Sequence, residues 1–93
     1  MKLLDKKELS ILGMKHKVIP FKEHDPTDNA MGRSLTKKGE IKICNEMPPD
    51  IREQTILHEV IHIISDHLGL EMKENQVCAL ATGLYSFIKE NKL

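Results

Sequence analysis

The first half of the chain mixes apolar and polar positions in short runs, the pattern of half-buried strands. Residues 8–12 and 16–22 form one pair of runs rich in β-branched side chains, and Gly13 between them favours a turn. Residues 34–36 and 40–44 form a second pair, and the latter run alternates with the two-residue period of a strand. This half therefore predicts a small antiparallel sheet made of two hairpins.

The second half changes to the three- and four-residue spacing of helices. A first helix is expected over residues 50–68, opened by a capping box of Asp50 and Glu53 and closed by Gly69. Its apolar residues occupy nearly all sides, so it should lie at the centre of the domain. A second helix is expected over residues 72–91, where an amphipathic stripe can pack on the first.

These elements together predict one α+β domain over residues 1–93, with the hairpins of residues 8–44 packed on the two helices. Fourteen basic and fourteen acidic side chains cancel, so the net charge does not favour nucleic acid. The three aromatic residues, Phe21, Tyr85 and Phe87, offer no platform for stacking bases. We expect neither a nucleic-acid nor a membrane partner, because no apolar run reaches the roughly 18 residues of a membrane span.

The two cysteines, Cys44 and Cys78, are too few and too far apart for a disulfide framework or a Cys-x-x-Cys zinc site. We interpret both as reduced thiols of a cytoplasmic protein. A polar loop contains His24, Asp25 and Asp28, which we interpret as ordinary turn residues rather than metal ligands.

The first predicted helix carries the motif His-Glu-x-x-His, which begins at His58 and ends at His62. Residues four apart share one helix face, so the two imidazoles can bind one zinc ion at roughly 2.0–2.1 Å each. Glu59 is rotated by about 100° from His58, beside such an ion, where it can hold a water and take its proton. Burying three polar groups among aliphatic side chains is costly unless a metal pairs with them. The motif therefore predicts Zn²⁺ ligands at His58 and His62 and a catalytic base at Glu59.

A catalytic zinc ion usually takes three protein ligands and a water, so a third ligand must come from elsewhere in the fold. Glu74 ranks first, because it lies in phase with the apolar face of the second helix. Glu71, Asp66 and Cys78 follow in that order; Asp66 suits support behind a ligand, and Cys78 can also be a plain core residue. Tyr85 lies about 16 Å beyond Glu74 on a straight helix, too far to reach the same reaction centre.

Residues 55–62, 68–71 and 74–77 resemble the small phage and prophage zincin-like proteins, which are related to the ImmA/IrrE metallopeptidases. The resemblance covers roughly residues 32–91 and implies a minimal zincin-like fold. It also implies that the glutamate opening the last helix, here Glu74, is the third ligand. The sequence departs from the pattern at Lys73, where a Ser or Thr cap is common. It is also far shorter than the repressor-cleaving members, so we expect no DNA-binding domain.

Motif and resemblance predict a zinc-dependent metallopeptidase that hydrolyses a peptide bond through a zinc-bound water activated by Glu59. Its substrate would be an unidentified peptide or protein in the cytoplasm, that of the host cell if the protein is phage-encoded. The alternatives are a non-catalytic, zinc-stabilised phage regulatory or protein-binding factor and a structural phage component that retains the motif by descent. Glu59 favours catalysis, because a purely structural zinc site needs no free carboxylate beside it.

Overall fold

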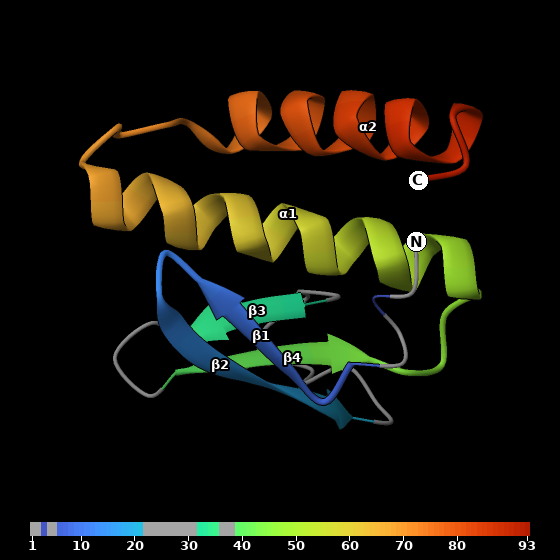
Figure 1. The fold of residues 1–93 in the computed structure, drawn as a ribbon, viewed down its shortest axis with the longest axis horizontal. Coiled ribbons are helices and arrows are strands. Elements are labelled where there is room, and N and C mark those ends of the chain that lie inside the picture. The colour runs from blue at the N-terminus through green and yellow to red at the C-terminus, as the bar shows by residue number, and fades with distance from the viewer. Residues whose placement is uncertain (1–2, 4–5, 22–31, 36–38) are drawn as a thin grey trace.

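Residue 3 and residues 6–21, 32–35 and 39–93 are described by a computed structural model of the chain. The strands are β1 (Glu8–Ile11), β2 (Met14–Phe21), β3 (Gly32–Leu35) and β4 (Glu40–Cys44), and the helices are α1 (Pro49–Leu68) and α2 (Glu74–Glu90). Figure 1 shows three layers, with α1 between the sheet on one side and α2 on the other. The α+β class predicted from the sequence is confirmed.

The sheet is mixed, with the strand order β1-β2-β4-β3. β1 pairs with β2, and β3 with β4, in antiparallel fashion, but β2 and β4 run parallel from Lys17 opposite Glu40 to Phe21 opposite Cys44. The expectation of a purely antiparallel sheet is therefore wrong. Side chains alternate between the two faces in both kinds of pairing, so the hydrophobic pattern does not distinguish them.

The larger core lies between this sheet and α1. Its fully buried side chains include Ile41 of β4 and Ile63 of α1, which are both 0% exposed. Ile56 and Ile63 are seven residues apart, two helical turns, and so present one face of α1 to the sheet. Each such side chain stabilises the fold by roughly 1.5–3 kcal/mol on burial. This packing turns the opposite side of α1 towards α2.

A second, smaller core joins the two helices. Ile61 of α1 packs with Val77 and Ala81 of α2, which are 0% and 1% exposed. A hydrogen bond from the side-chain amide of Gln54 to the hydroxyl oxygen of Thr82, 2.9 Å long, adds a polar contact along the same seam. These contacts set the position of α2 along the axis of α1.

The start of α1 differs from the expected capping box. The helix begins at Pro49, whose missing N–H suits a first helical position, and no described side chain caps it. The Tyr85 hydroxyl of α2 instead donates to the carboxylates of these two residues, 3.2 Å from Asp50 Oδ1 and 3.4 Å from Glu53 Oε1. The capping-box prediction is wrong because the helix begins one residue before Asp50, which places that residue inside the first turn rather than at the cap.

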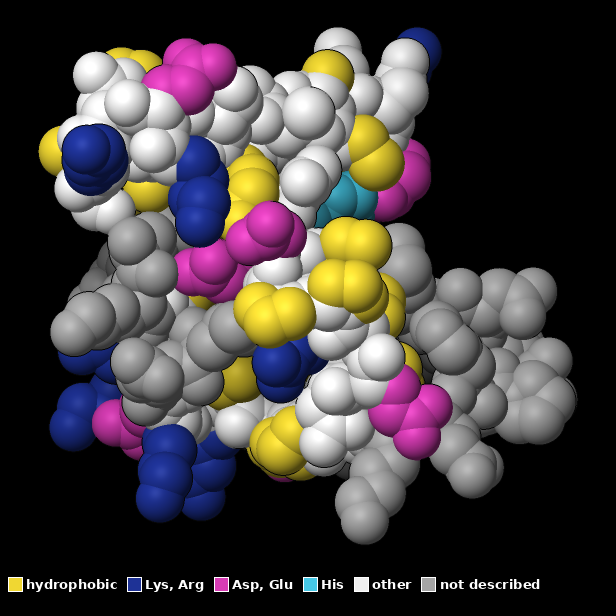
Figure 2. Space-filling view, turned by 90° about the vertical axis from the view of Figure 1, so that its right-hand side faces the viewer, with side chains coloured by type: hydrophobic (Ala, Val, Ile, Leu, Met, Phe, Trp, Pro, Cys, Tyr) yellow, Lys and Arg dark blue, Asp and Glu magenta, His cyan; other side chains and the backbone are white. Residues whose placement is uncertain are grey.

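Charged side chains also meet at this end of the helix pair. Lys89 Nζ of α2 lies 3.7 Å from Asp50 Oδ1 of α1. Figure 2 views the molecule from this end and shows basic and acidic side chains adjoining between the upper and lower parts of the surface. Neither helix in the described part of the chain has the length and apolarity needed to cross a membrane.

The end of α1 agrees with the prediction. Gly69 adopts the left-handed conformation (φ 65°), and the N–H of Leu70 donates to the carbonyl of Ser65 at 3.0 Å. A side chain at this φ would crowd the backbone, which is why glycine commonly ends helices. The chain is thereby turned back along α1, so α2 begins beside the last turns of α1.

Candidate metal centre

His58 and His62 stand one turn apart on α1, at the border between the helix pair and solvent. Their side chains are 19% and 28% exposed, and their ring centroids are 4.8 Å apart. The two Nε2 atoms lie 3.1 Å from each other. Both rings therefore direct the same nitrogen to one point, as the four-residue spacing predicts.

Glu74, the first residue of α2, places its carboxylate against both rings. Its Oε1 lies 2.7 Å from His58 Nε2, and its Oε2 lies 2.8 Å from His62 Nε2. The carboxylate thus connects the two histidines from a different helix.

The connection before α2 holds Glu74 at this place. The N–H of Met72 donates to Ser65 Oγ at 3.3 Å, which ties the connection to α1. The N–H of Lys73 donates to Gln76 Oε1 at 2.8 Å, so the glutamine side chain supports the helix start that lacks a Ser or Thr cap. With Val77 buried against α1, the first turn of α2 is anchored on both sides of Glu74.

The donor set fits a divalent transition metal. One ligand atom from each of His58, His62 and Glu74 lies within 4.8 Å of the others, so this group can hold a metal ion. Imidazole nitrogen and carboxylate oxygen are donors that zinc accepts, and tetrahedral ligation separates neighbouring donors by about 3.3 Å. The separations of 2.7, 2.8 and 3.1 Å must therefore widen by about 0.2 to 0.6 Å for an ion to enter.

Glu74 is poised to be anionic. Burial alone would raise its pKa, but the charges and hydrogen bonds of His58 and His62 outweigh that effect, so the pKa lies below its ordinary value. Its side chain is 65% exposed. The centre is therefore open to solvent on the side of α2, where a further ligand or a substrate can approach.

Among the remaining candidate ligands in the described part of the chain, only Cys78 approaches this group. Its Sγ lies 3.7 Å from His58 Nδ1 and 3.7 Å from Glu74 Oε1. Asp66 and Glu71 are exposed and lie outside the group that the described residues form. The ranking from the sequence had placed Cys78 last and did not foresee that it would contact two of the ligands.

The remaining predicted residues are dispersed. Glu59 is 7% exposed and follows His58 on α1, rotated by about 100° from it towards the side away from α2. Tyr85 contacts Asp50 and Glu53 at the far end of the helix pair, as its distance from Glu74 along α2 predicts. The loop residues His24, Asp25 and Asp28 lie outside the residues that the structure describes.

Comparisons of the chain with protein-family models, curated proteins and solved structures gave no match. No family assignment follows from them. The functional interpretation therefore depends on the chemistry and geometry of the residues themselves.

Proposed function

We propose that the protein is a zinc-dependent metallopeptidase of minimal zincin-like fold, in which His58, His62 and Glu74 hold Zn²⁺ and Glu59 is the catalytic base. One observation carries the proposal. A carboxylate from α2 lies within 2.8 Å of two imidazole nitrogens from α1. Three zinc-type donors from two helices thus converge, and Glu59, a second carboxylate, directly follows one of them on α1.

A zinc ion at this place would polarise the scissile carbonyl and make water more acidic. The chain supplies the remaining chemistry. His58, His62 and Glu74 contribute two neutral donors and one anionic donor, and the two-helix packing keeps their geometry. Glu59 accepts a proton from the attacking water and returns it to the leaving amine.

The surroundings of Glu59 suit this role. Glu59 is 7% exposed and therefore little solvated by bulk water, which strengthens any hydrogen bond it makes. Glu74 on the other side of the histidines is 65% exposed. A buried base at Glu59 and an exposed side at Glu74 together support hydrolysis of a peptide or protein that enters from solvent.

A second candidate function is a non-catalytic regulatory or protein-binding factor that zinc stabilises. It is favoured by Cys78, whose Sγ is 3.7 Å from both His58 and Glu74. A cysteine ligand in the fourth position would close the coordination sphere, as in structural zinc sites.

Metal content and peptide cleavage together test the proposal. Mass spectrometry on protein purified without added zinc should find close to one zinc ion per chain, and the double variant His58→Ala/His62→Ala should lose it. Full occupancy in that variant would contradict the metal site. A peptide library should then yield a cleaved substrate, whereas a zinc-loaded protein that cuts no peptide would favour the regulatory factor.

A further inference from the structure

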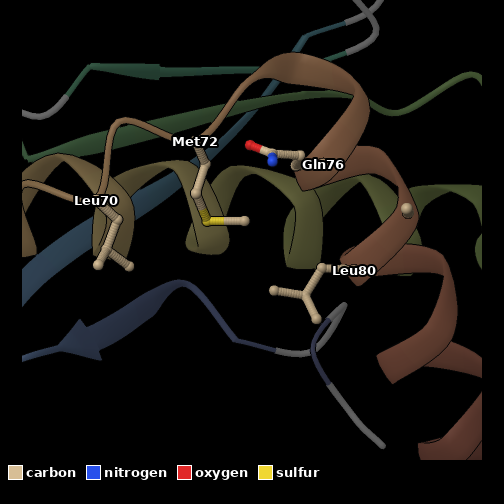
Figure 3. Close-up of a pocket in the computed structure, with 5 residues that line it drawn as sticks. Leu70, Met72, Gln76 and Leu80 are labelled. Carbon is tan, nitrogen blue, oxygen red and sulfur yellow. The ribbon is translucent and has the colours of Figure 1, made fainter.

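Hollows on the surface of the described residues differ in depth and in chemistry. The one beside the start of α2 is shallow, and Figure 3 shows Leu70, Met72 and Leu80 pointing to its open side. Its lining is uncharged, so it offers a ligand no specific contact. A second hollow, of about 160 Å³, is more enclosed and lies between the sheet and the first turns of α1.

Four polar residues line this second hollow, which we call the basic cavity: Lys6, Lys7, Asn45 and Arg52. The two lysines precede β1, Asn45 follows β4, and Arg52 belongs to the first turn of α1. The lining contains no acidic residue, and in the described part of the chain no ion pair engages its three cationic side chains. Three positive charges around one hollow attract an anion.

Backbone hydrogen bonds hold these segments together. The N–H of Val18 donates to the carbonyl of Lys7 at 2.9 Å, which ties the segment before β1 to β2. The N–H of Asn45 donates to the carbonyl of Phe21 at 2.8 Å, so the chain stays beside β2 for one residue beyond β4. The basic cavity is therefore formed by the fold itself.

Arg52 has a donor that the fold leaves unused. The residue is half-buried, and its Nε is buried without a hydrogen-bond partner. A buried donor without an acceptor is costly and uncommon in folded proteins. The Nε–H and one Nη–H of a guanidinium form a parallel pair of donors that matches the two oxygens of a carboxylate. A carboxylate is thus the acceptor that Arg52 lacks.

The rest of the lining is apolar and consists of Val18, Pro20, Ile43 and Ile56. Ile43 and Ile56 are 4% and 1% exposed, so they form the floor, whereas Lys6 and Lys7 are exposed at the rim. Inorganic phosphate has oxygens on all sides and would press some of them, unpaired, against this floor. The basic cavity therefore favours an anion that has an apolar part.

We propose that the basic cavity binds a carboxylate that carries a short branched apolar group. Arg52 holds the carboxylate through Nε and Nη, the two lysines add positive charge, and the apolar group lies on Ile43 and Ile56. A volume of 160 Å³ equals that of about five water molecules at roughly 30 Å³ each, which suits a small organic acid. A free branched-chain acid and a leucine at the C-terminus of a peptide share this chemistry.

The basic cavity is separate from the candidate metal centre. Arg52 precedes His58 by six residues, which is about 9 Å along α1 and about 120° around it. The inference goes beyond the proposed function and does not depend on it.

NMR titration of the ¹⁵N-labelled chain with 3-methylbutanoate, at constant pH and ionic strength, tests the site. The signals of Arg52 Nε–H and of the backbone amides around the cavity should shift and saturate. We expect a dissociation constant in the millimolar range, as is usual for so small a ligand. The neutral 3-methylbutanamide has nearly the same shape and should bind at least about 10-fold more weakly. Equal binding of the amide, or tighter binding of inorganic phosphate, would overturn the carboxylate assignment.

Substitutions in the lining test the residues. Arg52→Lys keeps the charge and the helix propensity but removes the paired donors, so it should weaken binding by about 10-fold. Lys7→Gln should weaken it by about 3-fold or more. Lys17→Gln is the matched control, because it removes the same charge from an exposed position of β2 outside the lining. Unchanged affinity in Arg52→Lys would contradict the paired hydrogen bonds.

Arg52→Met distinguishes a binding residue from a structural one. Because the buried Nε makes no hydrogen bond, methionine should leave the melting temperature unchanged or raise it, while binding of 3-methylbutanoate is lost. A clear fall in the melting temperature would show that Arg52 serves the fold, and would overturn its assignment as the binding residue.

The peptide Gly-Gly-Gly-Leu, with a free or an amidated C-terminus, distinguishes the two sources of the carboxylate. Saturating shifts with the free peptide but not with the amidated one would assign the basic cavity to a chain terminus. Saturation by 3-methylbutanoate alone would assign it to a free acid. A chain that neither compound saturates would overturn the proposal.

Discussion

His58 and Cys78 are in contact across the two helices, with Sγ of the cysteine 3.7 Å from Nδ1 of the imidazole. The other nitrogen of the same ring, Nε2, lies 2.7 Å from Glu74. If the sulfur accepts the Nδ1 proton, the lone pair of Nε2 is directed at the metal position. In that tautomer Cys78 lies behind His58 and orients the ring without binding the metal, which is the alternative to its serving as a fourth ligand.

Replacing Cys78 distinguishes an orienting residue from a ligand. Cys78→Ser keeps an acceptor for His58 Nδ1 and should bind zinc nearly as well as the wild type. Cys78→Val removes that acceptor and should weaken zinc binding by about 10-fold, the usual cost of losing a partner behind a metal ligand. Competition with a chromophoric chelator measures the affinity. Equal affinities in all three proteins would exclude the orienting role, and a large loss in Cys78→Ser would indicate direct ligation.

Glu74→Gln should weaken zinc binding by about 10-fold or more, since it replaces the anionic ligand with a weak neutral one. The same substitution at Glu71 is the control, because this residue is exposed and outside the ligand group. Isothermal titration of both variants with zinc gives the comparison. A greater loss in Glu71→Gln would mean that the first turn of α2 rearranges when metal binds.

Glu59→Gln separates catalysis from metal binding. Glutamine keeps the shape of the side chain but cannot take a proton from water, so hydrolysis should fall by about 100-fold or more. Zinc content and melting temperature should stay close to those of the wild type. Both are measured together with the cleavage rate of a peptide taken from the library. An unchanged rate would rule out Glu59 as the base even with zinc bound.

Tyr85 should make the helix pair sensitive to alkaline pH. Partial burial, and then the carboxylates of Glu53 and Asp50, raise its pKa to about 12. A tyrosine in the unfolded chain ionises near pH 10, so the protonated form favours the fold. This contribution is complete below about pH 10 and is lost as the pH rises towards 12.

The measurement is direct because Tyr85 is the only tyrosine of the chain. Phenolate absorbance should report a midpoint near 12 in the folded protein and near 10 in denaturant. Tyr85→Phe should lose less stability than the wild type between about pH 10 and 12. The difference between the two proteins is the contribution of the Tyr85 ionisation alone. A folded midpoint near 10 would contradict the contact with the two carboxylates.

Alanine at two glycines should have opposite effects on stability. Gly69 is left-handed (φ 65°), so Gly69→Ala should destabilise the fold by about 1 kcal/mol. Gly83 is inside α2, and no atom of the described residues lies within 4 Å of a Cβ built there, so Gly83→Ala should stabilise the fold by roughly 0.5–1 kcal/mol. Urea unfolding of both variants measures the two changes in stability. Destabilisation by Gly83→Ala would show that a contact inside the chain needs the glycine.

The sequence by itself determined the features that depend on near neighbours. The observed bounds of α1 differ by one residue from the predicted range of 50–68, and α2 begins within two residues of its predicted start. Helical spacing and the helix-ending Gly69 depend only on neighbouring residues, so they can be predicted without knowledge of the fold. The common direction of His58 and His62 has the same origin, because four residues make about one turn.

Only the tertiary structure decided which distant elements meet. The parallel pairing of β2 with β4 leaves the same alternation as an antiparallel pairing, so the pattern did not reveal it. Asp50 and Glu53 resembled a capping box, but Tyr85, more than thirty residues away, takes them. Glu74 was one of several candidate ligands until the packing of α2 on α1 set its position. A local pattern states what each residue can do, whereas long-range packing selects its partner.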